Sequence, residues 1–166
     1  CTLLTGTSHS YLYRNSMYEI ELPAGWIVKE NAGRPEEHLV KAVHPNGRAA
    51  IFVKTFKEDN PDKIFTAPED FARRVPLALL KKTCPSATLY RVRPINDNGL
   101  RGIESSMVCE LYYYTDLKFV NGKDVYSILA SFVDNQYIGE MVQGSVSSFK
   151  ILKKAKRKGK KNNYTP

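Results

Sequence analysis

The clearest pattern of hydrophobic and polar positions lies near the start of the chain. In the stretch 18–22, three apolar residues are separated by two glutamates, which is the period-two pattern of a strand with one buried face. The sequence Pro-Ala-Gly at positions 23–25 breaks this pattern, and Trp26, the only tryptophan, restarts it. We therefore predict an opening hairpin of strand, tight turn and strand, with Trp26 as a buried core anchor.

The same alternation predicts further strands, which are separated by turn sequences. Pro-Asn-Gly at 45–47 and Asn-Gly at 121–122 are strong hairpin signals, and Asn-Asp-Asn-Gly at 96–99 is another turn. All these connections favour antiparallel pairing. Besides the opening hairpin, the predicted strands are 10–14, 39–44, 49–56, 87–94, a long one at 101–115, 118–120 and 124–133.

Two segments have the apolar spacing of helices. The first runs from Ala67 to about Lys82, starts with a proline and two acids that suit a first turn, and should be kinked by Pro76. The second begins near Asn135 and extends to about Leu152. Strands interrupted by one helix and closed by another predict an α+β domain, with an antiparallel sheet of about six to seven strands covered by helices.

Length and composition are those of one globular domain. A chain of 166 residues buries roughly 70% of its unfolded surface, which is enough for a core without staples. Hydrophobic residues at 42% and charged residues at 25% indicate neither disorder nor a membrane-embedded chain. The longest apolar runs are too short to cross a bilayer.

The net charge of +8 is concentrated at one end of the chain. The segment 153–161 holds seven of the 25 basic residues, which leaves 18 basic against 17 acidic residues elsewhere, so a domain-wide nucleic-acid-binding face is not expected. The segment is either a solvated tail or a binding tail, for anionic lipid at about 1 kcal/mol per basic side chain or for nucleic acid. Its basic residues are Lys153, Lys154, Lys156, Arg157, Lys158, Lys160 and Lys161.

Cys1 and the small, hydroxylated residues after it resemble the start of a mature bacterial lipoprotein. This resemblance implies a diacylglycerol and usually an N-acyl chain on Cys1, which would hold the protein durably on a membrane facing the periplasm or the exterior. The alternative is that Cys1 is only the point where the sequence was cut. We expect a flexible tether at 1–10, one domain at 11–152 and a disordered basic tail at 153–166.

Three segments together resemble the domain shared by the photosystem assembly protein PsbP, the Ran-binding protein Mog1 and the bacterial protein DcrB. They are the opening motif at 18–26, the strand at 47–53 and the Ser148-Phe149 end of the last helix. The resemblance spans about Tyr11 to Leu152 and implies an α/β/α sandwich around an antiparallel sheet. It also implies partner binding or assembly without a common catalytic apparatus, and it carries no functional residue set onto this chain.

The chain lacks the motifs that catalytic and metal sites require. The histidines at 9, 38 and 44 include no pair at helical i, i+4 spacing, and no paired Cys-x-x-Cys is present. His38 with Glu36 and Glu37 is the best remaining group, although such surface groups often bind nothing. Neither a nucleophile elbow nor a phosphate-binding glycine loop occurs. We therefore expect no enzyme activity, no catalytic or metal residues and no cofactor.

Cys84 and Cys109 offer a choice between a disulfide and two buried thiols. Cys84 ends the first predicted helix, and Cys109 shares a strand face with Met107 and Leu111, so a helix over that face would bring the sulfurs together. In an oxidising compartment, a bridge closing this loop would contribute about 3 kcal/mol. Sequence alone leaves both states open.

Three consecutive tyrosines, 112–114, place rings on both faces of a strand. They either pack under helices with their hydroxyls at the rim or face a partner.

These features lead to two functional hypotheses. The first is a non-enzymatic, membrane-anchored lipoprotein of the cell envelope whose domain binds an unknown protein or supports assembly of a complex. The alternative is an intracellular adaptor of the Mog1 type whose basic tail contacts nucleic acid.

Overall fold

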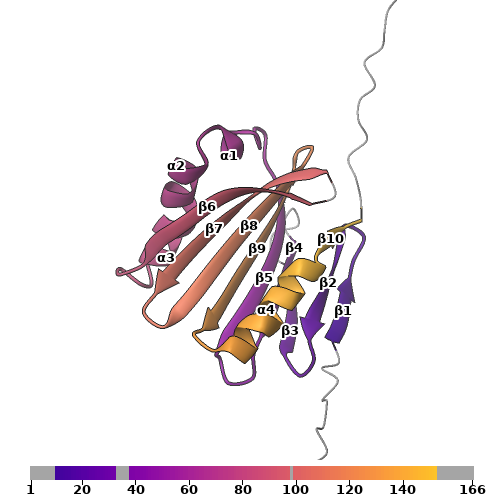
Figure 1. Ribbon diagram of the computed structural model, residues 1–166. Helices are drawn as coiled ribbons and strands as arrows, with labels where there is room; N and C mark the ends of the chain where they lie inside the picture. Colours follow the sequence, from indigo (N-terminus) through magenta and orange to yellow (C-terminus); the bar gives the residue numbers. More distant parts are fainter. Residues whose placement is uncertain (1–9, 33–37, 98, 153–166) are drawn as a thin grey trace, which may run out of the picture.

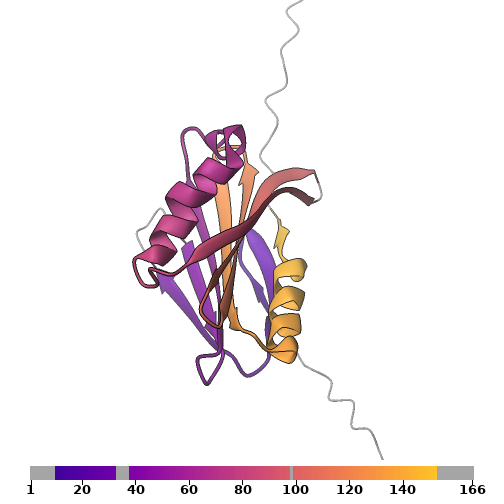
Figure 2. The same cartoon turned by 60° about the vertical axis from the view of Figure 1, so that its left-hand side comes forward.

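A long, twisted antiparallel sheet forms the centre of the molecule, with helices on both of its faces (Figures 1 and 2). The computed structural model describes residues 10–32, 38–97 and 99–152. In this part of the chain, no helix is both long and apolar enough to cross a membrane. The α+β class, the antiparallel sheet and the helical covering are all confirmed.

The strands fall into two sheets. The larger has seven strands in the order β3-β4-β5-β9-β8-β7-β6, and the smaller has the order β1-β2-β10; every pairing in them is antiparallel. The strands are β1 (Ser10–Arg14), β2 (Tyr18–Pro23), β3 (Ile27–Ala32), β4 (His38–Val43), β5 (Ala49–Lys57), β6 (Thr88–Asp97), β7 (Leu100–Cys109), β8 (Tyr112–Asn121), β9 (Asp124–Val133) and β10 (Lys150–Ile151).

The predicted opening hairpin is wrong in its pairing. β2 pairs with β1 and β10, whereas β3 pairs with β4, so the turn between them carries the chain from one sheet to the other. Gly25 supplies the left-handed conformation that this turn needs, with a φ of 78°. Alternation reports which face of a strand is buried and not which strand lies beside it.

The predicted strand at 101–115 is also wrong, because it is two strands. β7 ends at Cys109 and β8 begins at Tyr112, and Glu110 turns the chain with a φ of 54°. This left-handed conformation is unusual for glutamate, so composition did not indicate the turn. The hairpin at Asn121-Gly122 is confirmed, and β8 extends through the predicted short strand to reach it.

One face of the large sheet, called here the closed face, carries the main core. α4 (Gln136–Ser148) lies across it next to the small sheet (Figure 1). The Asn135 side chain caps α4 by accepting the Ile138 N–H at 3.1 Å. The core includes Tyr18, Ile20, Leu22, Trp26, Val40, Ile51, Val53, Leu117, Phe119, Tyr126, Ile128, Ala130, Ile138, Val142 and Phe149.

α4 ends earlier than the helical spacing predicts. Phe149 leaves the helix and packs against Tyr18 and Phe119, with ring centroids 5.4 and 6.1 Å apart. The next two residues form β10 and pair with β2. The chain after Ser148 therefore completes the small sheet instead of continuing the helix.

The opposite face of the large sheet, called here the groove face, is covered by the helical segment 63–81 (Figure 2). This segment consists of α1 (Lys63–Thr66), α2 (Pro68–Ala72), a π-helical turn η1 (Arg73–Leu77) and α3 (Ala78–Lys81). The predicted disturbance at Pro76 is present as the π-helical turn. Proline lacks the N–H that an α-helix would use at that position, so the turn widens around it.

Replacing Trp26 by alanine should lower the free energy of unfolding by about 3–5 kcal/mol, because this large side chain is only 8% exposed and would leave a cavity. Urea unfolding measures the change. Tyr137→Ala is the control, because Tyr137 is 67% exposed on α4 and should matter little. A loss below about 1 kcal/mol for Trp26→Ala would show that Trp26 is not a core anchor.

Candidate functional site

A groove of about 490 Å³ lies between the helical segment 63–81 and the groove face of the large sheet. We call it the helix–sheet groove. One wall comes from η1, α3 and Thr83, and the floor comes from β4, β5, β9, β8 and β7. Its lining residues are Leu39, Phe52, Lys54, Val75, Pro76, Leu79, Leu80, Thr83, Met107, Tyr114, Asp116, Lys118, Ser127 and Leu129.

The wall of the groove presents apolar side chains to solvent. Val75 is 44% exposed and Leu79 is 63% exposed, although both line the groove. Leu77, in contrast, is buried against Met107. Neighbouring apolar residues that stay exposed along a concave surface are typical of a binding site.

A buried ion pair forms the polar part of the groove floor. Lys118 Nζ donates to both carboxylate oxygens of Asp116, at 2.8 Å each, and to Ser127 Oγ at 3.0 Å. Ser127 Oγ in turn donates to Asp116 Oδ1 at 3.3 Å. Asp116 is 3% exposed and Lys118 is 7% exposed. Each of the three N–H donors of Lys118 therefore has an acceptor, and the pair forms a closed network.

Sequence reasoning did not identify this pair. The available signal was two charged residues at positions i and i+2 of a strand otherwise rich in β-formers. Such spacing places both charges on one face. The two charges become buried because the helical segment 63–81 partly covers this face of the sheet.

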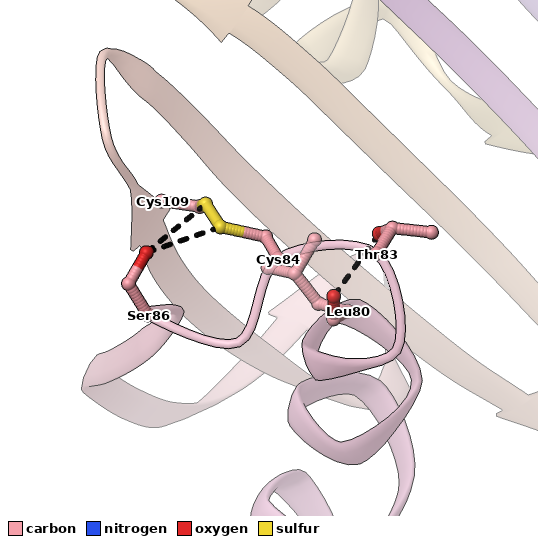
Figure 3. Close-up of a disulfide and its surroundings, with 5 residues drawn as sticks. All are labelled: Leu80, Thr83, Cys84, Ser86 and Cys109. Atoms are coloured by element: carbon pink, nitrogen blue, oxygen red, sulfur yellow. Dashed lines mark hydrogen bonds between the residues drawn. A yellow bond between two sulfur atoms is a disulfide. The ribbon is translucent and has the colours of Figure 1, made fainter.

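A disulfide anchors the end of the helical segment to the sheet (Figure 3). It joins Cys84, which follows α3, to Cys109 at the end of β7, with their Cα atoms 6.4 Å apart. Ser86 Oγ lies 3.3 Å from Cys84 Sγ and 3.8 Å from Cys109 Sγ. Leu111 does not share their face as predicted, because it lies in the β7–β8 turn and is 73% exposed.

The three tyrosines divide between the two faces of β8. Tyr114 lines the groove, and Tyr112 lies next to it with a centroid distance of 6.5 Å. Tyr113 stacks on Phe132 at 5.7 Å on the other face. Of the three rings, only those of Tyr112 and Tyr114 are thus near the groove.

A second charged cluster lies on the face opposite the groove. Glu104 is bound by Arg91 and Arg93, each with a nearest N–O distance of 2.7 Å. Burial alone would raise the pKa of Glu104, but the hydrogen bonds and charges of Arg93 and Arg91 outweigh burial and hold the pKa below its ordinary value. The carboxylate is thus held ionised, which suits a structural role and not a general acid.

A second hollow of about 480 Å³ lies beside Trp26 and is lined in part by Tyr11, Tyr13 and Glu30. Burial and a hydrogen bond to Glu30 raise the pKa of Tyr13 to about 12. The phenol therefore stays protonated at neutral pH and offers no base.

No group of three or more His, Cys, Asp or Glu side chains comes together to hold a metal within the described ranges. Several predicted sites fall outside the described residues. They are Cys1, the side chains of the Glu36-Glu37-His38 group, and the basic residues Lys153, Lys154, Lys156, Arg157, Lys158, Lys160 and Lys161.

The architecture has a close structural counterpart. A cyanobacterial PsbP, CyanoP from Synechocystis sp. PCC 6803, superimposes with a TM-score of 0.65, covering 91% of this chain and 96% of its own. The fold is PsbP-like. At 15% sequence identity, the PsbP-like assignment concerns the fold alone.

Other comparisons add less. A protein of unknown function, PA94 from Pseudomonas aeruginosa, described as a putative regulator, is 17% identical and covers 76% of this chain and 84% of its own, with a TM-score of only 0.42. No protein-family model and no curated sequence matches the chain. The PsbP-like assignment therefore rests on the CyanoP superposition and on the topology.

Lys118→Met should lower the free energy of unfolding by about 3–5 kcal/mol, because it leaves the buried Asp116 carboxylate without its cation. Guanidinium unfolding measures the change. Lys123→Met removes the same charge from an exposed pair with Asp59 and should have almost no effect. Equal effects of the two substitutions would contradict the assignment of a buried structural pair to the groove floor.

The Cys84–Cys109 disulfide should make both thiols unreactive in protein unfolded without reductant. Substituting both cysteines by alanine should cost about 3 kcal/mol, as the chain-entropy account gives for a loop of 25 residues. Thiol titration and urea unfolding measure the two effects. Two reactive thiols besides Cys1 would refute the bridge.

Proposed function

We propose that this chain is a non-enzymatic, membrane-anchored lipoprotein whose PsbP-like domain binds another protein in the assembly or upkeep of a cell-envelope complex. The observation that carries the proposal is the helix–sheet groove, where the exposed Val75 and Leu79 face a mainly apolar floor. Apolar side chains of a partner would displace water from the wall and the floor of this groove. Such burial of apolar surface is the main source of free energy in protein association.

The polar groups of the groove support binding over catalysis. Lys118, Asp116 and Ser127 satisfy one another, so a substrate would find no uncommitted acid, base or nucleophile in this network. A general base must be within hydrogen-bond reach of the proton that it removes, and here the carboxylate already accepts three hydrogen bonds. The network instead resembles a rigid support for the surrounding apolar contacts.

Rigidity of the groove wall also favours a binding role. The Cys84–Cys109 disulfide holds the C-terminal end of the helical segment on β7. At the other end, Ile64 packs in a buried cluster with Ile103 and Val125. A wall fixed at both ends loses little conformational entropy when a partner binds, and this raises affinity.

Membrane attachment would come from the two ends of the sequence. A lipidated Cys1 carries two or more acyl chains, and such anchors are durable, whereas a single chain is marginal. The seven basic residues at 153–161 would add attraction to anionic lipids. The domain would then meet its partner at the membrane surface.

Photocrosslinking in the cells that make the protein tests both parts of the proposal. With Leu79 replaced by the photoreactive residue benzoylphenylalanine, we expect a discrete, light-dependent protein adduct in the membrane fraction, since position 79 lines the groove and is exposed. Introducing Cys1→Ser should move the protein to the soluble fraction, because it removes the lipid attachment point.

The same photoreactive residue at Leu111 is the matched control, because Leu111 is a similarly exposed leucine that does not line the groove. It should give no such adduct. Absence of an adduct from position 79, or equal adducts from both positions, would refute binding in the groove. Unchanged membrane recovery of the Cys1→Ser protein would refute the lipid anchor.

A further inference from the structure

Three lysines project from neighbouring strands onto the open side of the helix–sheet groove. Lys54 of β5 lines the groove itself. Lys41 of β4 is directly opposite Phe52, and its Nζ lies 5.1 Å from the centroid of that groove-lining ring. Lys29 of β3 is directly opposite Lys41 in the next pairing. Residues directly opposite one another share a face, so the three ammonium groups extend the groove floor toward the sheet edge.

Among the described side chains of β3, β4 and β5, no acidic group shares this face with Lys29 and Lys41. The other described side chains on this face of β3, β4 and β5 are apolar by their place in the register, namely Ile27, Leu39, Val43, Ala50, Phe52 and Phe56. In the described part of the chain, neither Lys29 nor Lys41 makes an ion pair. Like charges directly opposite across two strands are destabilising. A bound anion would relieve this cost.

We propose that the partner enters the groove with an acidic segment, which places an apolar side chain between Leu79 and Leu129 and carboxylates against Lys29 and Lys41. This inference rests on the proposed function and specifies the chemistry of the partner. Adjacent strands are about 4.8 Å apart, so Leu129 on β9 is about 10 Å from Lys41 on β4 and about 14 Å from Lys29 on β3. An extended chain crosses these distances in about three to four residues. The acidic residues should therefore lie within about four positions of the apolar one.

The shape of the surface favours a protein segment over an anionic bilayer. The apolar part is recessed between the helical segment and the sheet, and the half-buried Leu129 and Phe52 form its floor. A flat bilayer surface would meet the exposed Lys29 and Lys41 but would leave this recess unfilled. A side chain on a flexible segment can enter the recess and contact both its wall and its floor.

The test uses the full chain carrying benzoylphenylalanine at position 79, in the cells that make it, with the crosslinked peptide identified by mass spectrometry. We compare it with the same chain carrying Lys29→Glu and Lys41→Glu. The control is Arg48→Glu with Lys57→Glu, which changes the net charge equally at two exposed positions that do not line the groove. Unfolding midpoints verify that each variant is folded. If the chain with Lys29→Glu and Lys41→Glu does not fold, the chain with Lys29→Gln and Lys41→Gln takes its place.

We expect the adduct to map to a protein segment with at least one Asp or Glu within about four residues of the crosslink. Its yield should fall roughly five- to tenfold when the two lysines are reversed, and it should stay within about twofold in the control. In the unreversed chain, raising the salt concentration during irradiation of isolated membranes should also lower the yield, because salt screens exposed charges.

Several outcomes would overturn the inference. They are a yield that does not respond to reversal of Lys29 and Lys41, an adduct peptide without nearby acids, and an adduct with lipid or with a second copy of this chain. An adduct that lacks charge dependence refutes the acidic segment alone. Complete absence of an adduct from position 79 refutes the proposed function as well.

Discussion

One buried ion pair constrains the whole groove face of the large sheet. Burying a carboxylate and an ammonium costs several kcal/mol per ion unless each keeps its partners, so Asp116, Lys118 and Ser127 must stay locked together. β8 meets this constraint by alternation, with the ion pair on the groove face and Leu117 and Phe119 in the core of the closed face. The helical segment packs beside the pair, on Met107 and Ile103, and the groove lies between.

The two faces of the sheet are stabilised by different interactions. The closed face carries the main core, in which α4 and the small sheet bury aromatic and branched residues together. The groove face is held by two smaller apolar clusters and the Cys84–Cys109 disulfide, and it leaves Val75 and Leu79 exposed. Most of the buried apolar residues thus lie on the closed face, whereas the groove face combines a buried ion pair and a disulfide with exposed apolar residues.

The sequence predicts the elements of this fold better than their arrangement. Alternation at 18–22 identified a strand, and the Asn121-Gly122 turn located a hairpin, because both signals are local. The switch between sheets after Pro23 and the turn at Glu110 depend on packing and on an unusual backbone conformation, which composition does not report. The groove could not be predicted, since it requires knowing which face the helical segment covers.

The central claim is that the partner occupies the helix–sheet groove, and hydrogen exchange tests it most directly. Exchange of the full chain is compared in its native membranes and after separation from its partners in detergent and high salt. The account predicts slower exchange in the membranes for residues 75–83 and for β4, with no change in the β7–β8 turn or in α4. Protection confined to α4 and the small sheet would contradict it, because the partner would then lie on the closed face.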